Sequence, residues 1–406
     1  MNRPRVLIMM HYMELGGAES ALLGLLQSVN PERIDVDVFV YDHRGELMQY
    51  IPMDKVRLLP EVTAYKMIER PIKECIKAGQ IGVALGRWWA KKTVNRSPVP
   101  KGRDDIRIFA RIADCVERFV PMIQPNVEYD LAISFLIPHN YVLSKVKAKK
   151  KMGWIHTDYS TVYVDLKREQ PVWEKLDYIG SISEEVGNKF EETFHALHHK
   201  IRPIENILST AFIRQRAQEF VPDDFVRSQG VINILSIGRF SYPKRFDEIG
   251  TICRKVLSCM HAVNSELKLH WYLIGFGYEE PIRKNVKDEG MEDFITILGK
   301  KANPYPYIQA CDVYAQPSRY EGKSITVREA QIMCKPVVVT NYPTASSQIQ
   351  DGLDGVIVPM EMEECAKGIA SFVIDYKKRM DIVAYLNEHD YGNEDEIEKI
   401  YQLVGA

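Results

Sequence analysis

The stretch "VINILSIGRF", residues 231–240, decides the fold, because a pattern seen earlier in the chain starts again with it. That pattern first begins at "RVLIMM" (5–10), a short apolar run followed by a glycine loop and a helical segment. Short apolar runs that alternate with helical segments are typical of a parallel sheet with helices on both faces. Two such series predict an α/β chain with two doubly wound domains.

Further apolar runs place the domains along the chain. In the first series they lie at 34–41, 129–135, 150–156 and 178–183, and in the second at 269–277, 294–299, 311–318, 335–341 and 355–359. The polar stretch "VPDDFVRSQG" (221–230) separates the series. The sequence therefore predicts a first domain over 1–222, a second over 223–385, and a C-terminal helix within 386–406 that can pack back on the first domain.

Composition narrows the class of protein. The 406 residues are 46% hydrophobic and 27% charged, with a net charge of −2, which gives no general attraction to nucleic acid. The N-terminus has neither a signal-peptide pattern nor an apolar run long enough to span a bilayer. Seven scattered cysteines without a C-x-x-C pair argue against a disulfide framework or a zinc site. We expect a cytoplasmic protein.

One segment, 66–111, departs from the pattern. It carries twelve Lys or Arg residues against four Asp or Glu, with Trp88 and Trp89 among them. It can be a solvated, basic helical insertion in the first domain. Basic residues beside tryptophans also suit an anionic lipid headgroup or a lipid-linked acceptor, and both interpretations stay open.

Two loops carry features of a phosphate site. In "ELGGAES" (14–20), Gly16 and Gly17 lie between a strand and a helix, where paired glycines let a ligand approach the backbone. In "SIGRFSYPKRFD" (236–247), Arg239 and Lys244 follow a strand and can bind a diphosphate. A plain turn and an exposed basic loop are the respective alternatives.

The stretch "SRYEGKSITVREA" (318–330) adds two carboxylates, Glu321 in a loop and Glu329 inside the helix that follows. A carboxylate accepts two hydrogen bonds and so suits the neighbouring hydroxyls of a sugar or a ribose. We expect free amides at Lys323, Ser324 and Ile325 to suit a phosphate. The alternative for Glu329 is a partly exposed glutamate in a surface ion pair.

Together, "GGAE" (16–19), "WIHTDY" (154–159), "IGRF…KRFD" (237–247) and "EGKSITVRE" (321–329) resemble the retaining glycosyltransferases of family 4. The resemblance implies the GT-B fold, in which two Rossmann-like domains face a cleft. It implies that Glu321 contacts the transferred sugar, that Glu329 holds the ribose, and that Arg239 and Lys244 bind the diphosphate without a divalent metal. The residues that it assigns to donor binding are Gly16, Gly17, Arg239, Lys244, Glu321, Gly322, Lys323, Ser324, Ile325 and Glu329.

His156 ends the predicted strand 150–156. The family has a histidine at this place that touches the donor sugar, so the resemblance implies a catalytic set of His156, Glu321, Arg239 and Lys244. We expect His156 to position the donor rather than to act as a general base. A structural histidine is the alternative.

Two departures from the family pattern affect these expectations. Lys323-Ser324 stands where many members have Phe-Gly, so the family pattern does not indicate which donor sugar this chain prefers. The segment "ENIL" (205–208) stands where many have Asn-Gly-Val-Asp, near the hinge.

The resemblance implies transfer of a sugar, with retention, from a nucleotide-diphosphate-sugar, expected to be a UDP-sugar. The expected acceptor is a hydroxyl of a glycan or a lipid-linked molecule in polysaccharide biosynthesis, reached in the cytoplasm or at the inner face of the membrane through the 66–111 segment. A nucleotide-sugar epimerase of the same architecture is an alternative. A catalytically silent homologue that acts as a binding partner is another.

Overall fold

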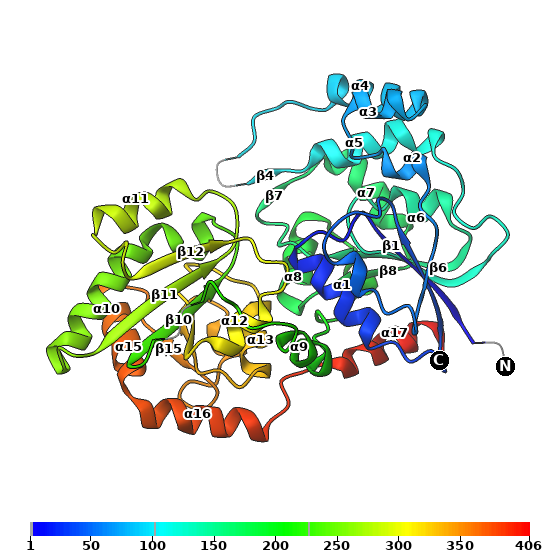
Figure 1. The fold of residues 1–406 in the computed structure, drawn as a ribbon. Coiled ribbons are helices and arrows are strands. Elements are labelled where there is room, and N and C mark those ends of the chain that lie inside the picture. Colours follow the sequence, from blue (N-terminus) through cyan, green and yellow to red (C-terminus); the bar gives the residue numbers. More distant parts are fainter. Residues whose placement is uncertain (1–2, 101–102, 226–227) are drawn as a thin grey trace. The chain divides into compact units, whose positions relative to one another are not determined.

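The computed structural model describes residues 3–100, 103–225 and 228–406. The chain forms two compact units, one made of Met1–Ile207 with Asn393–Ala406 and the other of Leu208–Gly392 (Figure 1). Each unit contains one large parallel sheet, so the predicted α/β class with two doubly wound domains is confirmed. Residues 101–102 of the basic segment and 226–227 of the predicted linker lie outside the described residues.

The sheet of the first unit has the order β3-β2-β1-β5-β6-β8-β9, and all of its strand pairs are parallel. Its strands are β1 (Arg5–Met10), β2 (Asp35–Val40), β3 (Arg57–Leu58), β5 (Tyr129–Ser134), β6 (Ala148–Ile155), β8 (Tyr178–Ser181) and β9 (Ile201–Pro203). A separate two-stranded sheet pairs β4 (Asp104–Asp105) with β7 (Val162–Tyr163). Strand β1 is buried from Val6 to Met10, as a central parallel strand must be, which explains its continuous apolar run.

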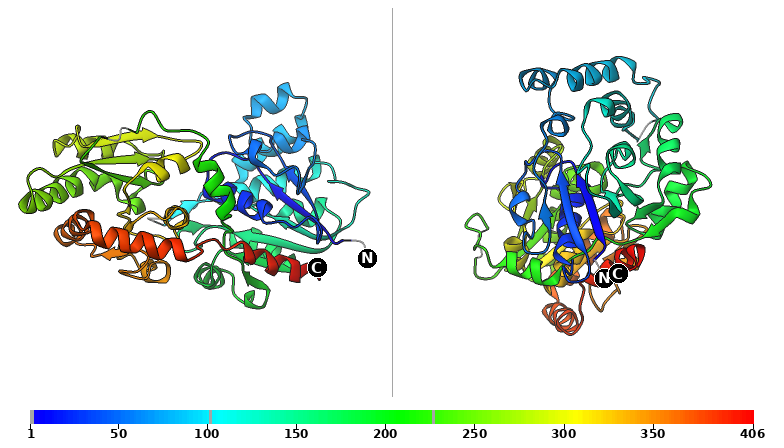
Figure 2. Two further views of the ribbon diagram at one scale, coloured as in Figure 1. Left: turned by 60° about the horizontal axis from the view of Figure 1, so that its bottom comes forward. Right: turned by 90° about the vertical axis from the view of Figure 1, so that its right-hand side faces the viewer.

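The helices of the first unit include one from the far end of the chain. They are α1 (Gly17–Gln27), α2 (Thr63–Lys66), α3 (Ile72–Lys77), α4 (Ile81–Thr93), α5 (Arg107–Val116), α6 (Asn140–Lys145), α7 (Leu166–Lys175), α8 (Glu184–Thr193) and α17 (Ile397–Val404). The backbone N–H of Asn30 donates to the hydroxyl of Tyr401 at 2.8 Å, and Arg33 pairs with Glu398. Helix α17 thus packs on the first unit, close to the N-terminal segment of the chain (Figure 2).

The sheet of the second unit has the order β12-β11-β10-β13-β14-β15, again with all strand pairs parallel. Its strands are β10 (Val231–Ile237), β11 (Lys268–Ile274), β12 (Ile295–Gly299), β13 (Val313–Gln316), β14 (Val337–Thr340) and β15 (Val356–Val358). Neighbouring residues of β10 point to opposite faces: Ile234 belongs to one apolar core and Leu235 to another. Helices therefore cover both faces of this sheet.

The helices of the second unit divide between these two cores. They are α9 (Thr210–Ala217), α10 (Ile249–Val263), α11 (Glu280–Asp288), α12 (Tyr305–Ala310), α13 (Ile325–Ile332), α14 (Ala345–Gln348), α15 (Met362–Ile374) and α16 (Tyr376–Glu388). The units divide at 207/208 and 392/393, whereas the sequence placed the divisions at 222/223 and 385/386. The physical reason for the first difference is α9, whose Ile213 packs in the core that contains Val327 of α13.

Within the described part of the chain, no helix has the length and apolar character that crossing a bilayer requires.

Candidate functional site

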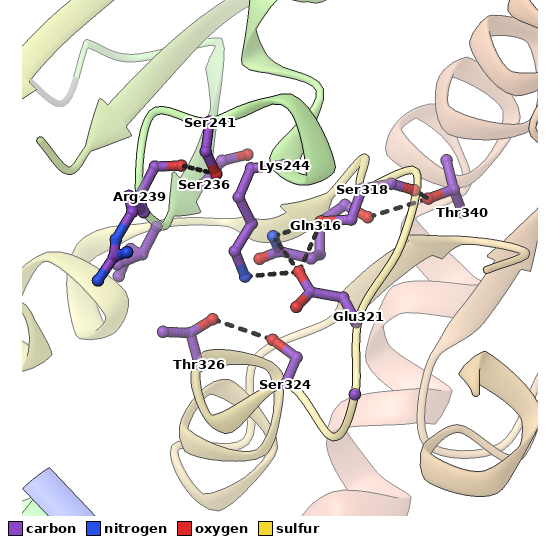
Figure 3. A network of polar contacts seen from close by, with 12 residues as sticks. Ser236, Arg239, Ser241, Lys244, Gln316, Ser318, Glu321, Ser324, Thr326 and Thr340 are labelled. Carbon is purple, nitrogen blue, oxygen red and sulfur yellow. Dashed lines mark hydrogen bonds and ion pairs between the residues drawn. The ribbon is translucent and has the colours of Figure 1, made fainter. Parts of the chain in front are cut away.

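The second sheet reverses its strand order between β10 and β13, which are paired neighbours. In open parallel sheets, ligands bind beyond the carboxyl ends of the strands at such a reversal. The loop after β10 runs through a 3₁₀ turn at Tyr242–Lys244, and the loop after β13 leads to α13. The predicted residues Arg239, Lys244 and Glu321 all lie on these two loops (Figure 3).

Lys244 and Glu321 meet at this point, although 77 positions separate them in the chain. The Lys244 Nζ donates to Glu321 Oε1 at 2.6 Å, and the two side chains point toward each other in Figure 3. Ser318 Oγ donates to the same oxygen at 2.6 Å and Gln316 Nε2 at 3.1 Å. Glu321 is buried, so these three donors compensate a charge that water would otherwise solvate.

Gln316 and Ser318 are functional candidates that the sequence analysis missed. Both are fully buried, and Gln316 Nε2 also donates to Ser318 Oγ at 2.9 Å. The Tyr314 hydroxyl donates to Gln316 Oε1 at 2.8 Å and fixes the orientation of this amide. The signal was present in "AQPS" (315–318), because buried polar residues at the carboxyl end of a strand need a partner.

Gly238 lets the stem of Lys244 cross the end of β10. A Cβ on Gly238 would lie 3.1 Å from both Cδ and Cε of Lys244. Gly275 is closer still to its neighbour, since a Cβ there would lie 1.9 Å from the carbonyl oxygen of Gly238. Arg239 is exposed beside this crossing, and the structure does not bring it to Glu321.

Glu329 is buried inside the unit, so the alternative of a surface ion pair is wrong. The Tyr305 hydroxyl donates to its Oε1 at 2.8 Å. Burial raises the pKa of Glu329 to about 7, while the Tyr305 hydrogen bond and the charge of Arg216 lower it in part. At neutral pH this carboxyl is close to its titration point, which is unusual for a structural glutamate and common at functional sites.

The start of α13 differs from the expectation in one respect. The backbone N–H of Ser324 donates to Gln348 Oε1 at 3.0 Å, and Gln348 Nε2 donates back to the Ser324 carbonyl at 2.7 Å. The expectation that the Ser324 amide is free is therefore wrong, because a side chain from α14 uses it. Gly322 and Lys323 are exposed, and Ile325 is half-buried.

The predicted residues of the first unit lie at the carboxyl ends of its strands. Gly16 is the N-cap of α1, and a Cβ there would lie 2.2 Å from Glu19 Oε2, so the turn needs glycine unless Glu19 moves. His156 follows β6 and packs against Phe135 with a centroid distance of 4.5 Å. Burial lowers the pKa of His156 to about 3, so the imidazole is neutral at pH 7.

Neither ring nitrogen of His156 makes a hydrogen bond of normal geometry with the described residues. Among the same residues, no group of three or more His, Cys, Asp or Glu side chains is arranged to hold a metal ion.

Residues 218–389 match the family model described as "Glycosyl transferases group 1". The amylovoran biosynthesis glycosyltransferase AmsD of Erwinia amylovora is 26% identical over 176 residues, which are 42% of this chain and 47% of AmsD. The lipopolysaccharide core biosynthesis mannosyltransferase LpsB of Rhizobium meliloti is 26% identical over 105 residues, 25% of this chain and 30% of LpsB. The chain thus matches less than half the length of these curated relatives.

Solved structures resemble the whole chain. HepE of Anabaena, in complex with UDP and glucose, superposes with a TM-score of 0.63 at 15% identity and with full coverage of both chains. A mutant of TarM from S. aureus, in complex with Fondaparinux, alpha-GlcNAc-glycerol and UDP, gives a TM-score of 0.65 at 14% identity, covering 99% of this chain and 100% of TarM. These likenesses show the GT-B fold and confirm that part of the expectation.

Proposed function

We propose that the chain is a member of the glycosyl transferases group 1, whose family model its residues 218–389 match, and that it transfers a sugar from a nucleotide-diphosphate-sugar to a hydroxyl acceptor. The donor proposed is a UDP-sugar, since HepE and TarM, which share the fold, were solved with UDP. The acceptor proposed is a glycan or a lipid-linked molecule of polysaccharide biosynthesis, in keeping with the pathways named for AmsD and LpsB.

The observation that carries the proposal is the pairing of Lys244 with Glu321 where the strand order reverses, with buried Glu329 on the helix that follows. A diphosphate offers oxygens that Lys244 and Arg239 can bind. Glu321 would accept hydrogen bonds from the transferred sugar, and Glu329 from the ribose. The exposed residues Gly322 and Lys323, with Ile325, would lie against the donor.

The proposed reaction needs stabilisation of the departing diphosphate more than acid–base chemistry. The bond between the anomeric carbon and the phosphate oxygen breaks, and the electron pair leaves with the diphosphate. The acceptor oxygen bonds to the same face of that carbon, and its proton passes to the departing phosphate. Lys244 and Arg239 would stabilise the developing negative charge without a divalent metal.

The first unit supplies the remaining proposed residues. The Gly16–Gly17 turn would let the donor approach the backbone at the start of α1. His156 would donate one hydrogen bond to a sugar hydroxyl from a neutral ring, which its low pKa favours. We place the reaction in the cytoplasm, with peripheral contact to the inner face of the membrane.

A donor screen followed by product analysis tests the proposal. Unfolding temperatures measured with UDP-, GDP- and ADP-hexoses should rise with the correct donor, because a bound ligand stabilises the folded chain. That donor, incubated with a bacterial lipid extract, should yield a glycosylated product with retained anomeric configuration by NMR. An epimerised donor formed without any acceptor would contradict the proposal in favour of an epimerase, and donor binding without turnover would favour a silent homologue.

A further inference from the structure

Helices α3 and α4 lie at the outer edge of the first unit (Figures 1 and 2), and together they carry a group of exposed apolar side chains. Its five large side chains are each 43–58% exposed, and they are Ile76, Ile81, Leu85, Trp88 and Trp89. Four of them lie on α4 at intervals of three and four residues, so they share one side of the helix. We call these five residues the α3–α4 face.

The opposite side of α4 already packs against the unit. Val83, Ala84 and Ala90 are buried there. A Cβ on Gly86 would lie 2.7 Å from the backbone carbonyl of Cys115 in α5, so the two helices approach closely. Helix α4 is therefore apolar on two sides. One side packs in the first unit, and the α3–α4 face is a second apolar side that stays exposed.

Lysines border this face. Lys73, Lys77, Lys91 and Lys92 are exposed on the two helices, with Glu74 as the acidic residue beside them. The Lys92 Nζ lies 4.1 Å from the ring centroid of Trp88. Lysine is depleted at protein–protein interfaces, whereas tryptophan with lysine on an amphipathic helix is typical of the boundary between water and an anionic bilayer.

We propose that the α3–α4 face docks on an anionic lipid bilayer. Helix α4, with 13 residues or about 20 Å of length, lies in the headgroup plane rather than across the membrane. Leu85, Trp88 and Trp89 enter the boundary with the acyl chains, and the lysines contact lipid phosphates. This deepens the membrane contact in the proposed function but uses no donor-site residue, so either proposal can fail while the other stands.

Tryptophan fluorescence gives a specific readout. The chain has five tryptophans, and Trp154, Trp173 and Trp271 are buried. Vesicles of phosphatidylcholine with 30% phosphatidylglycerol, brominated on the acyl chains, should quench the emission of the full chain through Trp88 and Trp89. Quenching should be much weaker with phosphatidylcholine alone and should decrease as salt is added, because the lysine contribution is screened.

Matched variants distinguish binding through the α3–α4 face from nonspecific adsorption to the vesicles. Trp88→Ser with Trp89→Ser should lower partitioning to these vesicles about tenfold or more, because two indoles lose their apolar contact. Lys91→Glu with Lys92→Glu should lower it by at least about fivefold for each lysine. The controls Val263→Ser with Tyr376→Ser, and Lys268→Glu with Lys377→Glu, change exposed residues of the second unit and should leave this partitioning unchanged.

Thermal unfolding and UDP binding should be the same in all these variants, which establishes that they fold. Three results would overturn the proposal: a full chain that stays unbound to every vesicle, binding that survives the double serine change, or a dimer in solution that the double serine change dissociates. The last result would assign the face to a second copy of the chain.

Discussion

Glu329 is the residue whose protonation should be visible in the stability of the protein. Its pKa is about 7 in the folded protein and near 4.5 in an unfolded chain, so between these values the folded state binds the extra proton. The free energy of unfolding therefore falls as the pH rises toward 7, and this contribution is lost above it. Glu329→Gln keeps an acceptor for Tyr305 without a charge.

We expect the free energy of unfolding of Glu329→Gln, relative to that of the wild type, to rise by roughly 2–3 kcal/mol from pH 5 to pH 8. Urea unfolding of both proteins at the two pH values measures this change. The exposed change Glu388→Gln serves as the control and should show no such gain. An equal stability difference at both pH values would mean that Glu329 does not titrate in this range.

Glu321 and Glu329 should serve different parts of the donor. Glu329→Gln should weaken binding of free UDP, because the ribose is present in UDP. Glu321→Gln should leave UDP binding nearly intact and mainly lower kcat, because its proposed partner is the transferred sugar. Calorimetric titration of UDP beside steady-state rates distinguishes the two, and the reverse pattern would show that the roles are exchanged.

At the scale of elements, we predict that a change in the buried side of α17 destabilises the first unit alone. Ile400 and Tyr401 are buried there, although they belong to the last turns of the chain. Ile400→Ala should cost about 2–5 kcal/mol through the cavity it leaves, and amide hydrogen exchange should rise in the first unit rather than in the second. Gln402→Ala, on the exposed side of the same helix, should change neither quantity; exchange that rises only in Leu208–Gly392 would contradict the assignment.

The strands were predictable because central parallel strands are buried on both faces, so runs such as "RVLIMM" and "VINILSI" need no polar residue. The sequence also placed the loops after β10 and β13 correctly, because each of these loops begins where a predicted strand ends. What the sequence could not predict depends on contacts between distant residues. Gln348 accepts a hydrogen bond from the Ser324 amide from another helix, and the Tyr305 hydroxyl donates to Glu329 from 24 positions away. The sequence likewise shows that α4 is apolar on two sides, but it could not predict which side packs against the first unit and which stays exposed.

For the whole molecule, we predict transfer without a divalent metal. In the proposed site, Arg239 and Lys244 would supply the positive charge that a metal would otherwise bring to the diphosphate. Turnover with the correct donor should therefore be unchanged in excess EDTA, measured by release of UDP. Activity that EDTA abolishes and magnesium or manganese restores would contradict this role of the two cations.

The central claim is that the loops after β10 and β13 bind a nucleotide diphosphate. Calorimetric titration of UDP into the full chain and into Lys244→Ala tests it most directly, with Lys301→Ala, a second-unit lysine paired with Asp224, as the matched control. Losing a charge-assisted contact should weaken UDP binding about ten- to a hundredfold in Lys244→Ala and leave the control unchanged. Equal UDP affinity in all three proteins, or no UDP binding by the full chain, would contradict the account.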